Sequence, residues 1–440
     1  MKLSWVCALG MFLVSSGAGV AVALDAAHTL RHAKASEPHL TETHRAGSHR
    51  AATHAARPAA KSSAVRGQAA RATGKAARAG QSARLATKGS TRATARRASL
   101  TTRRRHNFGE RFTASSFASG DIFSEDVTAG EDPLVRQAAI DALAGMNGTA
   151  VVINPANGRI LAMVNQKLAL SPGAEPCSTI KITVAMAALS EGLVTRDTPV
   201  QLAGFRMNMT EALAHSNNLY FEELGRELGF DRVRHYANQF GLGELAGYNI
   251  PGEHLGVYPD HELPASEGGV GRMCSFGQGV SLTPLQLGAY VAAIANGGTL
   301  FYLQHPTTLQ EAASLQPKVK RKLDIAKYVP DLQDGMAGAV EYGTARRLRA
   351  SFNAFPVFGK TGTCSDKGTR FGWFASYSDS PQGSLVTVFF LEGGRPTFGP
   401  RAAELTGVFY KNLLDRNYFG AKGQQTAEVL PPAFVTEPQQ

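Results

Sequence analysis

The chain has 440 residues, of which 43% are hydrophobic, and its 46 Lys and Arg against 35 Asp and Glu give a formal net charge of +11. This length suggests one large domain or two ordinary ones, and the hydrophobic content excludes an entirely disordered chain. Only four cysteines are present, without the spacing of metal ligands, so the sequence predicts neither a disulfide scaffold nor a metal site.

The positive charge is confined to one segment near the N-terminus. Residues 26–107 contain 18 Lys and Arg and two acids, Glu37 and Glu42, which is a net charge of +16. Residues 108–440 therefore carry a net charge of −5. A basic segment ahead of a mildly acidic domain gives no reason to expect nucleic acid as a partner.

Residues 3–24 form an apolar run that follows Lys2, and residues 1–23 are the candidate signal or anchor segment. The small residues Ala21 and Ala23 predict an export signal that is cleaved after Ala23. About 20 apolar residues also suffice to span a bilayer, so an uncleaved membrane anchor is the alternative. Both readings place the rest of the protein outside the cytoplasm, in the periplasm or on the outer face of the cytoplasmic membrane.

Residues 24–107 are rich in Ala, Arg, Lys and His and contain few large apolar side chains. Such a segment cannot bury enough surface to offset chain entropy, so we expect a disordered linker. It either acts only as a spacer or also binds an anionic lipid or envelope polymer. Residues 108–132 predict an acidic connector, and residues 419–440 predict a flexible C-terminal tail.

Folded structure is expected from about Pro133 to residue 418. The hydrophobic spacing predicts a helix, two strands around a turn at residues 154–158, a largely helical middle, three strands and a closing helix. The helical patterns lie at 134–144, 180–193, 209–228, 231–240, 284–295 and 401–414, and the strand patterns at 149–153, 159–164, 357–364, 370–377 and 385–392.

The two groups of strands predict an α/β (α+β) fold. Short loops between consecutive strands require antiparallel pairing. We therefore expect a mostly antiparallel five-stranded sheet assembled from both ends of the domain, flanked by helices, with a helical subdomain inserted between its two halves.

Three short motifs carry candidate chemistry. Ser178 and Lys181 are three residues apart at the start of a helix, which puts them on one face. A serine hydroxyl is a poor nucleophile until a base takes its proton, and a buried lysine held neutral by desolvation and a second cation can be that base. An ordinary helical turn with a solvated lysine is the alternative.

The second and third motifs are Ser216-Asn217-Asn218 and Lys360-Thr361-Gly362-Thr363. Ser216 could relay a proton and Asn218 could hold a substrate amide, whereas an ordinary polar turn is the alternative. Lys360 and the two threonine hydroxyls on a strand suit a substrate carboxylate, and Gly362 allows close backbone approach. An edge strand protected by a lysine is the alternative there.

The three motifs, in this order, resemble the serine penicillin-recognising family, and in particular the transpeptidase domain of class B-like penicillin-binding proteins. Residues 149–164 and 275–298 resemble the family's first hairpin and its turn-plus-helix segment, and Trp373 fits its next strand. The resemblance covers about residues 133–414. It implies the β-lactamase/transpeptidase-like fold, peptidoglycan stem peptides as substrates and β-lactams as inhibitors, without a metal or cofactor.

Residue by residue, the resemblance implies that Ser178 is the acylated nucleophile and Lys181 its base. Ser216 would pass a proton to the leaving amine, Asn218 would bind the acyl side chain, and Lys360 would lower the proton affinity of Lys181 and attract the substrate carboxylate.

Thr361 and Thr363 would contact that carboxylate region, beside Gly362. The backbone N–H groups of Ser178 and Thr363 would form the oxyanion hole. The reaction implied is D,D-transpeptidation through an acyl-enzyme, in which a neighbouring peptide amine takes the acyl group.

Other branches of the family remain alternatives. A D,D-carboxypeptidase would let water attack the acyl-enzyme, and a sensor would acylate once without turnover. A class A β-lactamase usually has Asp where Asn217 stands, and a class D enzyme has Val where Asn218 stands. Only the basic linker and a short connector precede the catalytic region, which leaves no room for a glycan-polymerising domain and favours a monofunctional enzyme.

Two cysteines depart from the family's usual pattern, Cys177 before the nucleophile and Cys364 after the third motif. If Ser178 and Thr363 share an oxyanion hole, these neighbouring cysteines are close enough to bridge, and export would permit a disulfide. Cys274 is an equally open partner for either cysteine.

Overall fold

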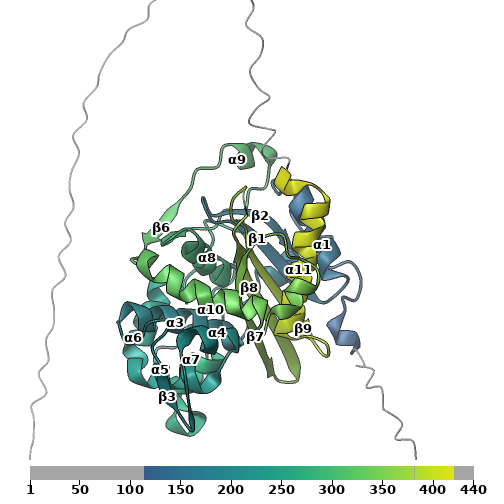
Figure 1. Cartoon of the computed structure of the whole chain (residues 1–440). Coiled ribbons are helices and arrows are strands. Elements are labelled where there is room, and N and C mark those ends of the chain that lie inside the picture. The colour runs from purple at the N-terminus through teal and green to yellow at the C-terminus, as the bar shows by residue number, and fades with distance from the viewer. Residues whose placement is uncertain (1–112, 381, 421–440) are drawn as a thin grey trace, which may run out of the picture. The chain divides into compact units, whose positions relative to one another are not determined.

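The computed structural model describes residues 113–380 and 382–420 (Figure 1). The expected export signal or anchor and the basic linker lie outside the described residues, as do residues 108–112 of the connector and the tail beyond residue 420.

A five-stranded sheet forms the centre of the folded unit. Its strands run in the order β2-β1-β9-β8-β7, and every neighbouring pair is antiparallel. The strands are β1 (Gly148–Asn154), β2 (Arg159–Val164), β7 (Val357–Asp366), β8 (Thr369–Ser378) and β9 (Val386–Gly393). This confirms the predicted sheet and its assembly from both ends of the domain.

Tight turns fix the strand pairing. The β7–β8 turn consists of Lys367 and Gly368, which both have positive φ angles (47° and 86°), the geometry of two-residue hairpin turns. The β1–β2 turn is held by its own asparagines, since Asn154 Oδ1 accepts a hydrogen bond from the Ala156 N–H.

Helices cover both faces of the sheet. On one face, α1 (Pro133–Leu143) and α11 (Gly399–Asp415) lie side by side, where they bury strand residues such as Phe374 and Phe389 (Figure 1). On the other face, α8 (Pro284–Ala295) packs on β9, β8 and β1. The alternate strand residues Trp373 and Phe390 belong to the larger core there. Because side chains alternate along each strand, successive strand residues pack into different hydrophobic cores on the two faces of the sheet.

The helical subdomain lies between the two halves of the sheet in sequence. Its helices are α3 (Lys181–Ser190), α4 (Met209–Ala214), α5 (Asn218–Leu228), α6 (Phe230–Gln239), α7 (Gly269–Phe276) and α10 (Val329–Glu341). Shorter helices are α2 (Gln166–Ala169), α9 (Leu309–Ala313) and the 3₁₀ turns η1 (Ala114–Ser116), η2 (Cys177–Ile180), η3 (Ala265–Glu267), η4 (Ala326–Tyr328) and η5 (Arg346–Ala350).

Three expectations about the middle of the chain need correction. The helical pattern at 209–228 is two helices, because the chain turns at Ser216, whose φ is 56°. The pattern at 180–193 begins as η2 and becomes α3 at Lys181. Four short strands were missed: β3 (Val200–Leu202) pairs with β4 (Phe205–Met207), and β5 (Thr299–Phe301) with β6 (Val319–Lys322). Runs of three or four residues are too short to show a period.

Folded structure begins before Pro133, contrary to expectation. Ser116 is fully buried and its hydroxyl donates to the Arg395 carbonyl. The Asp126 carboxylate accepts hydrogen bonds from the N–H groups of Asn165 and Gln166, at 2.9 and 2.7 Å. Residues 113–132 are therefore packed on the domain, because their acids satisfy backbone donors that would otherwise be buried without partners.

In the ranges that the structure describes, no helix has both the length and the apolar character needed to cross a bilayer.

Candidate active site

The three motifs lie together where the helical subdomain contacts the edge strand β7. The first motif spans η2 and the start of α3, the second is the turn between α4 and α5, and the third lies in β7. Side chains of the first two motifs contact one buried amine, that of Lys181, which is 0% exposed, and Lys360 of the third motif joins them through Ser216.

Ser178 and Lys181 share one helical face, as their spacing predicts. Lys181 Nζ lies 3.1 Å from Ser178 Oγ. The Thr179 hydroxyl donates to the Pro176 carbonyl at 2.7 Å, which closes the first turn around the serine. The amine is therefore within proton-transfer distance of the hydroxyl.

The turn at Ser216 and the start of α5 supply the other partners of Lys181. Nζ lies 2.6 Å from Asn218 Oδ1, 2.9 Å from the Ser216 carbonyl oxygen and 3.2 Å from Ser216 Oγ. Asn217 caps α5, since its Oδ1 accepts from the Tyr220 N–H. The cap fixes Asn218 as the first helical residue, facing the lysine.

Lys360 brings β7 into the same network. Its side chain is fully buried, and Nζ donates to Ser216 Oγ at 2.8 Å and to the Thr361 carbonyl at 3.1 Å. The Ser216 hydroxyl therefore joins the two lysine amines.

Burial changes the protonation of both lysines. The pKa of Lys181 is well below its ordinary value, first because of desolvation and then because of the charge of Lys360, while Glu222 acts in the opposite direction. Burial also lowers the pKa of Lys360 to about 7. A neutral Lys181 amine has two hydrogens for its two closest acceptors, Asn218 Oδ1 and the Ser216 carbonyl, and a lone pair left for a hydroxyl.

The threonines of the third motif point away from the lysines. The Thr361 hydroxyl donates to Thr344 Oγ1 at 2.7 Å, and Thr363 Oγ1 accepts from the Gly399 N–H at 2.8 Å. Thr361 is 4% exposed, whereas Thr363 is exposed. Solvent can therefore reach the side chain of Thr363, whereas that of Thr361 is buried.

Gly362 lies against the segment that carries the serine. A Cβ at this position would lie 2.8 Å from the Pro176 carbonyl oxygen. Any side chain would push β7 away from η2, so the close approach requires glycine.

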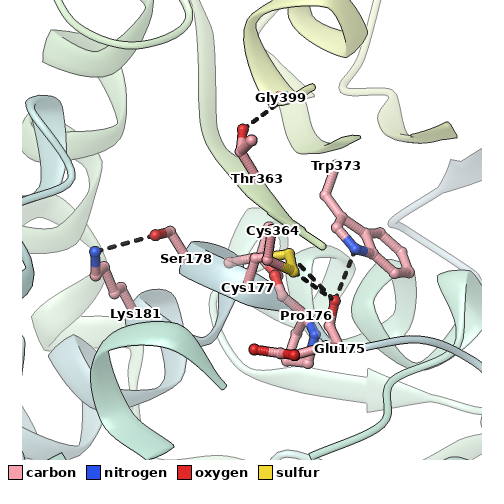
Figure 2. The surroundings of a disulfide bond; sticks show 10 residues. Glu175, Pro176, Cys177, Ser178, Lys181, Thr363, Cys364, Trp373 and Gly399 are labelled. Carbon is pink, nitrogen blue, oxygen red and sulfur yellow. Dashed lines mark hydrogen bonds between the residues drawn. A yellow bond between two sulfur atoms is a disulfide. The ribbon is translucent and has the colours of Figure 1, made fainter. Parts of the chain in front are cut away.

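A disulfide joins Cys177 to Cys364, with 5.6 Å between their Cα atoms (Figure 2). Cys274 is a free, buried thiol. Of the pairings that the sequence left open, the structure contains the one between the neighbours of Ser178 and Thr363.

The structure brings five of the expected side chains into direct contact: Ser178, Lys181, Ser216, Asn218 and Lys360. Thr361, Gly362 and Thr363 lie beside them on β7. Sequence reasoning missed Thr344, the partner of Thr361, and Phe221, whose ring centroid is 5.6 Å from Lys181 Nζ. Neither belongs to a motif. The helical period of α5, which places Phe221 three residues after Asn218, could have suggested the second.

The arrangement suits nucleophilic chemistry. A hydroxyl contacts an amine whose pKa is lowered, which is the arrangement of an activated nucleophile and its base. Within residues 113–420, apart from residue 381, no group of three His, Cys, Asp or Glu side chains could hold a metal ion.

Curated bacterial proteins are similar to this chain in sequence, and two of them serve as examples. The chain is 30% identical to stage V sporulation protein D of Bacillus subtilis over 318 residues, and this alignment covers 60% of this chain and 48% of that protein. It is 27% identical over 354 residues to the peptidoglycan D,D-transpeptidase MrdA of Acinetobacter baumannii, with 62% and 52% covered. The chain thus spans about half the length of these relatives.

The fold and the family agree with the motifs. A crystal structure of a peptidoglycan glycosyltransferase from Burkholderia ambifaria superposes with a TM-score of 0.57 at 18% identity, over 66% of this chain and 98% of that one, which shows a shared fold. Residues 148–405 match the family described as the penicillin binding protein transpeptidase domain. That match covers more than half of the chain and includes all three motifs, so the protein belongs to the penicillin-binding protein transpeptidase family.

Proposed function

We propose that this protein is a peptidoglycan D,D-transpeptidase that cross-links stem peptides through an acyl-enzyme on Ser178. The observation that carries the proposal is the fully buried Lys181 amine, 3.1 Å from Ser178 Oγ and held by two acceptors from the second motif. The family, and relatives that are named peptidoglycan D,D-transpeptidases, support the same reaction.

Acylation begins with the proton of the Ser178 hydroxyl. Neutral Lys181 accepts this proton while Oγ attacks the carbonyl carbon between the two terminal D-alanines. The negative charge that develops on the carbonyl oxygen is stabilised by the N–H groups of Ser178 and Thr363. Each such donor is typically worth about 3–4 kcal/mol.

The leaving amine needs a proton, and Ser216 is placed to provide it. Its hydroxyl lies 3.2 Å from Lys181 Nζ and 2.8 Å from Lys360 Nζ. The hydroxyl gives its own proton to the departing D-Ala nitrogen and takes one from a lysine ammonium. The C–N bond breaks, D-Ala leaves, and the peptide remains as an ester on Ser178.

The second half-reaction transfers the acyl group. An amine of a neighbouring stem peptide attacks the ester carbonyl, loses a proton through the same side chains and releases Ser178. Positively charged Lys360 attracts the terminal carboxylate in the first half-reaction, and Thr361 and Thr363 border the site of that carboxylate. β-Lactams would acylate Ser178 as mimics of the substrate.

Penicillin labelling tests this proposal. The purified protein should form a covalent adduct with a fluorescent penicillin, and Ser178→Ala should abolish it. Ser365→Ala, an exposed serine of the same strand, is the matched control and should label normally. Failure of the wild-type protein to label would exclude the proposed nucleophile.

Product analysis separates the proposed reaction from its alternatives. With pentapeptide substrates that end in D-Ala-D-Ala, a transpeptidase forms cross-linked dimers and a carboxypeptidase forms tetrapeptides. Rapid release of hydrolysed penicillin would identify a β-lactamase, and a stable adduct without product would identify a sensor.

The domain arrangement and location are part of the same proposal. Residues 1–23 direct export or anchor the chain, residues 24–107 form the basic linker, and the catalytic domain then works outside the cytoplasm, in the periplasm or at the outer face of the membrane. The net charge of +16 on residues 26–107 would also bind the linker to an anionic envelope polymer or lipid.

A further inference from the structure

The Cys177–Cys364 disulfide joins the two segments that would form the oxyanion hole (Figure 2). Ser178 follows Cys177 in the chain, and Thr363 precedes Cys364. Consecutive Cα atoms are 3.8 Å apart, so each proposed N–H donor is one peptide unit from a bridged cysteine. The disulfide therefore acts on the separation of the two donors themselves.

On the serine side, the backbone depends on its surroundings. Cys177 is fully buried and has a φ of +51°, in the left-handed region that residues other than glycine rarely adopt. A residue other than glycine keeps this backbone conformation only where the surrounding structure holds it. The Cys177 side chain contributes to that restraint through the bond to Cys364.

On the strand side, β7 is the last strand of the sheet and pairs with β8 alone. Lys360 and Cys364 lie on the same face of β7, because side chains alternate along a strand. Lys360 contacts Ser216 and Cys364 contacts η2, so this face meets the helical subdomain. An edge strand that pairs with only one neighbour can shift unless a further contact holds it in place.

Two weaker contacts accompany the covalent bond. Trp373 of β8 donates its Nε1–H to the Glu175 carbonyl at 3.0 Å. The two sulfurs lie 3.4 and 3.7 Å from the same oxygen, as contacts without a hydrogen, since a disulfide has none to donate. This hydrogen bond connects the segment before Ser178 to β8, whereas the disulfide connects that segment covalently to β7.

We propose that Cys177 and Cys364 are positioning residues, whose disulfide fixes the two backbone donors of the oxyanion hole at the separation that acylation needs. The inference rests on the proposed function, which assigns those donors. Donors stabilise an oxyanion only within about 2.7–3.1 Å, and a misplacement of about 1 Å can cost about 10²-fold in rate. Loss of the bond should therefore slow acylation more than it weakens binding.

The test compares Cys177→Ala/Cys364→Ala with Cys274→Ala, which removes a thiol that is outside the bridge. Stopped-flow labelling of the full chain with fluorescent penicillin separates the non-covalent Kd from the acylation rate constant. We expect the double variant to acylate about 10- to 100-fold more slowly with Kd changed less than about threefold. Cys274→Ala should match wild type in both.

A chemical version removes the bond without substitution. In Cys274→Ala protein, a dithiol reductant converts the disulfide to two thiols and is itself oxidised. Reduction below the melting temperature should slow acylation by the same factor, and oxidised glutathione should restore the rate. This arm remains available if the double variant does not fold.

The outcomes separate this inference from the proposed function. Failure of the oxidised wild-type protein to label would reject the proposed function itself. Wild-type labelling together with an unchanged acylation rate in the reduced protein or in the folded double variant would overturn the positioning role, even if the melting temperature falls. An equal loss in Kd and rate would also overturn it, because it would indicate a general loosening of the site.

Discussion

Ser216 Oγ lies 2.8 Å from Lys360 Nζ, a contact between residues 144 positions apart in the chain. The same oxygen lies 3.2 Å from Lys181 Nζ, so one hydroxyl connects two buried amines. Burial lowers the pKa of both amines, and the charge of Lys360 lowers that of Lys181 further. The predictions about the site follow from this arrangement.

Replacing Lys181 with methionine should remove the base and keep most of its side-chain volume. We expect the acylation rate constant to fall by about 10²–10⁴-fold, the range for a lost general base, while non-covalent penicillin binding changes little. Lys167→Met, at an exposed lysine, should leave the rate unchanged. A Lys181→Met protein that acylates at the normal rate would mean that another group takes the serine proton.

The pH dependence of acylation should reflect both lysines. The rate should rise with pH as Lys181 becomes neutral, and this rise should lie well below the ordinary lysine range, because burial and the charge of Lys360 lower its pKa. Above about pH 7 the second-order rate constant should fall, since Lys360, with a pKa of about 7, loses the charge that attracts the carboxylate.

Lys360→Arg tests which group causes the fall. A guanidinium stays protonated throughout this range, so the descending limb should disappear even if the absolute rate is lower. A descending limb that persists in Lys360→Arg would assign it to a different group. The measurement is the second-order rate constant for penicillin labelling between pH 5 and about pH 10.

Gly362→Ala should force β7 and η2 apart. The new Cβ would lie 2.8 Å from the Pro176 carbonyl oxygen and 3.1 Å from Thr179 Cγ2. Overpacking of this kind typically costs about 1–3 kcal/mol, and it should also slow acylation because it moves the strand next to the serine. Thermal unfolding and penicillin labelling measure the two effects, with Ser365→Ala as the control on the same strand. Unchanged values in Gly362→Ala would show that the strand can shift without consequence.

Arg136→Met should show that residues 113–132 are part of the fold. Arg136 pairs with Asp126 at 2.7 Å and Glu131 at 3.0 Å, and these carboxylates are only 3% and 1% exposed. Removing the cation takes the arginine partner from two buried acids, which keep their contacts with backbone N–H groups and His305, so we expect a loss of about 3–5 kcal/mol in the free energy of unfolding.

Arg226→Met is the matched control for that prediction. Arg226 also pairs with two glutamates, but its side chain is 53% exposed, so its loss should cost less than about 1 kcal/mol. Chemical denaturation of both variants gives the comparison. Equally small losses would contradict a structural role for the Arg136 network.

Deleting residues 24–107 should weaken retention of the protein in the envelope and leave penicillin labelling of Ser178 unchanged. The difference in retention between the wild-type and the deleted protein should diminish at high salt, because salt screens the binding of a basic segment to an anionic surface. Replacing the Lys and Arg of the linker with Gln keeps its length and should have the same effect as the deletion. Equal retention of all three proteins would leave the linker as a spacer.

The sequence predicted the elements that have a clear period or a strong boundary. Helix 284–295 matches α8 at both ends, where Thr283 and Gln286 form a capping box, and strand 159–164 matches β2. Local signals are enough in these cases, because the residues that stop an element are adjacent to it. The short strands were missed because they have no such signal, whereas the interruption at Ser216 was missed although Asn217 is a cap residue for α5.

The sequence by itself determined that Ser178 and Lys181 share a helix face, because three residues of spacing decide that locally. Only the tertiary structure decided that Ser216 contacts this lysine and Lys360 contacts Ser216, and that Cys177 pairs with Cys364 rather than with Cys274. It also decided the protonation of the site. Desolvation lowers the pKa of both lysines, and desolvation exists only after distant segments have packed around them.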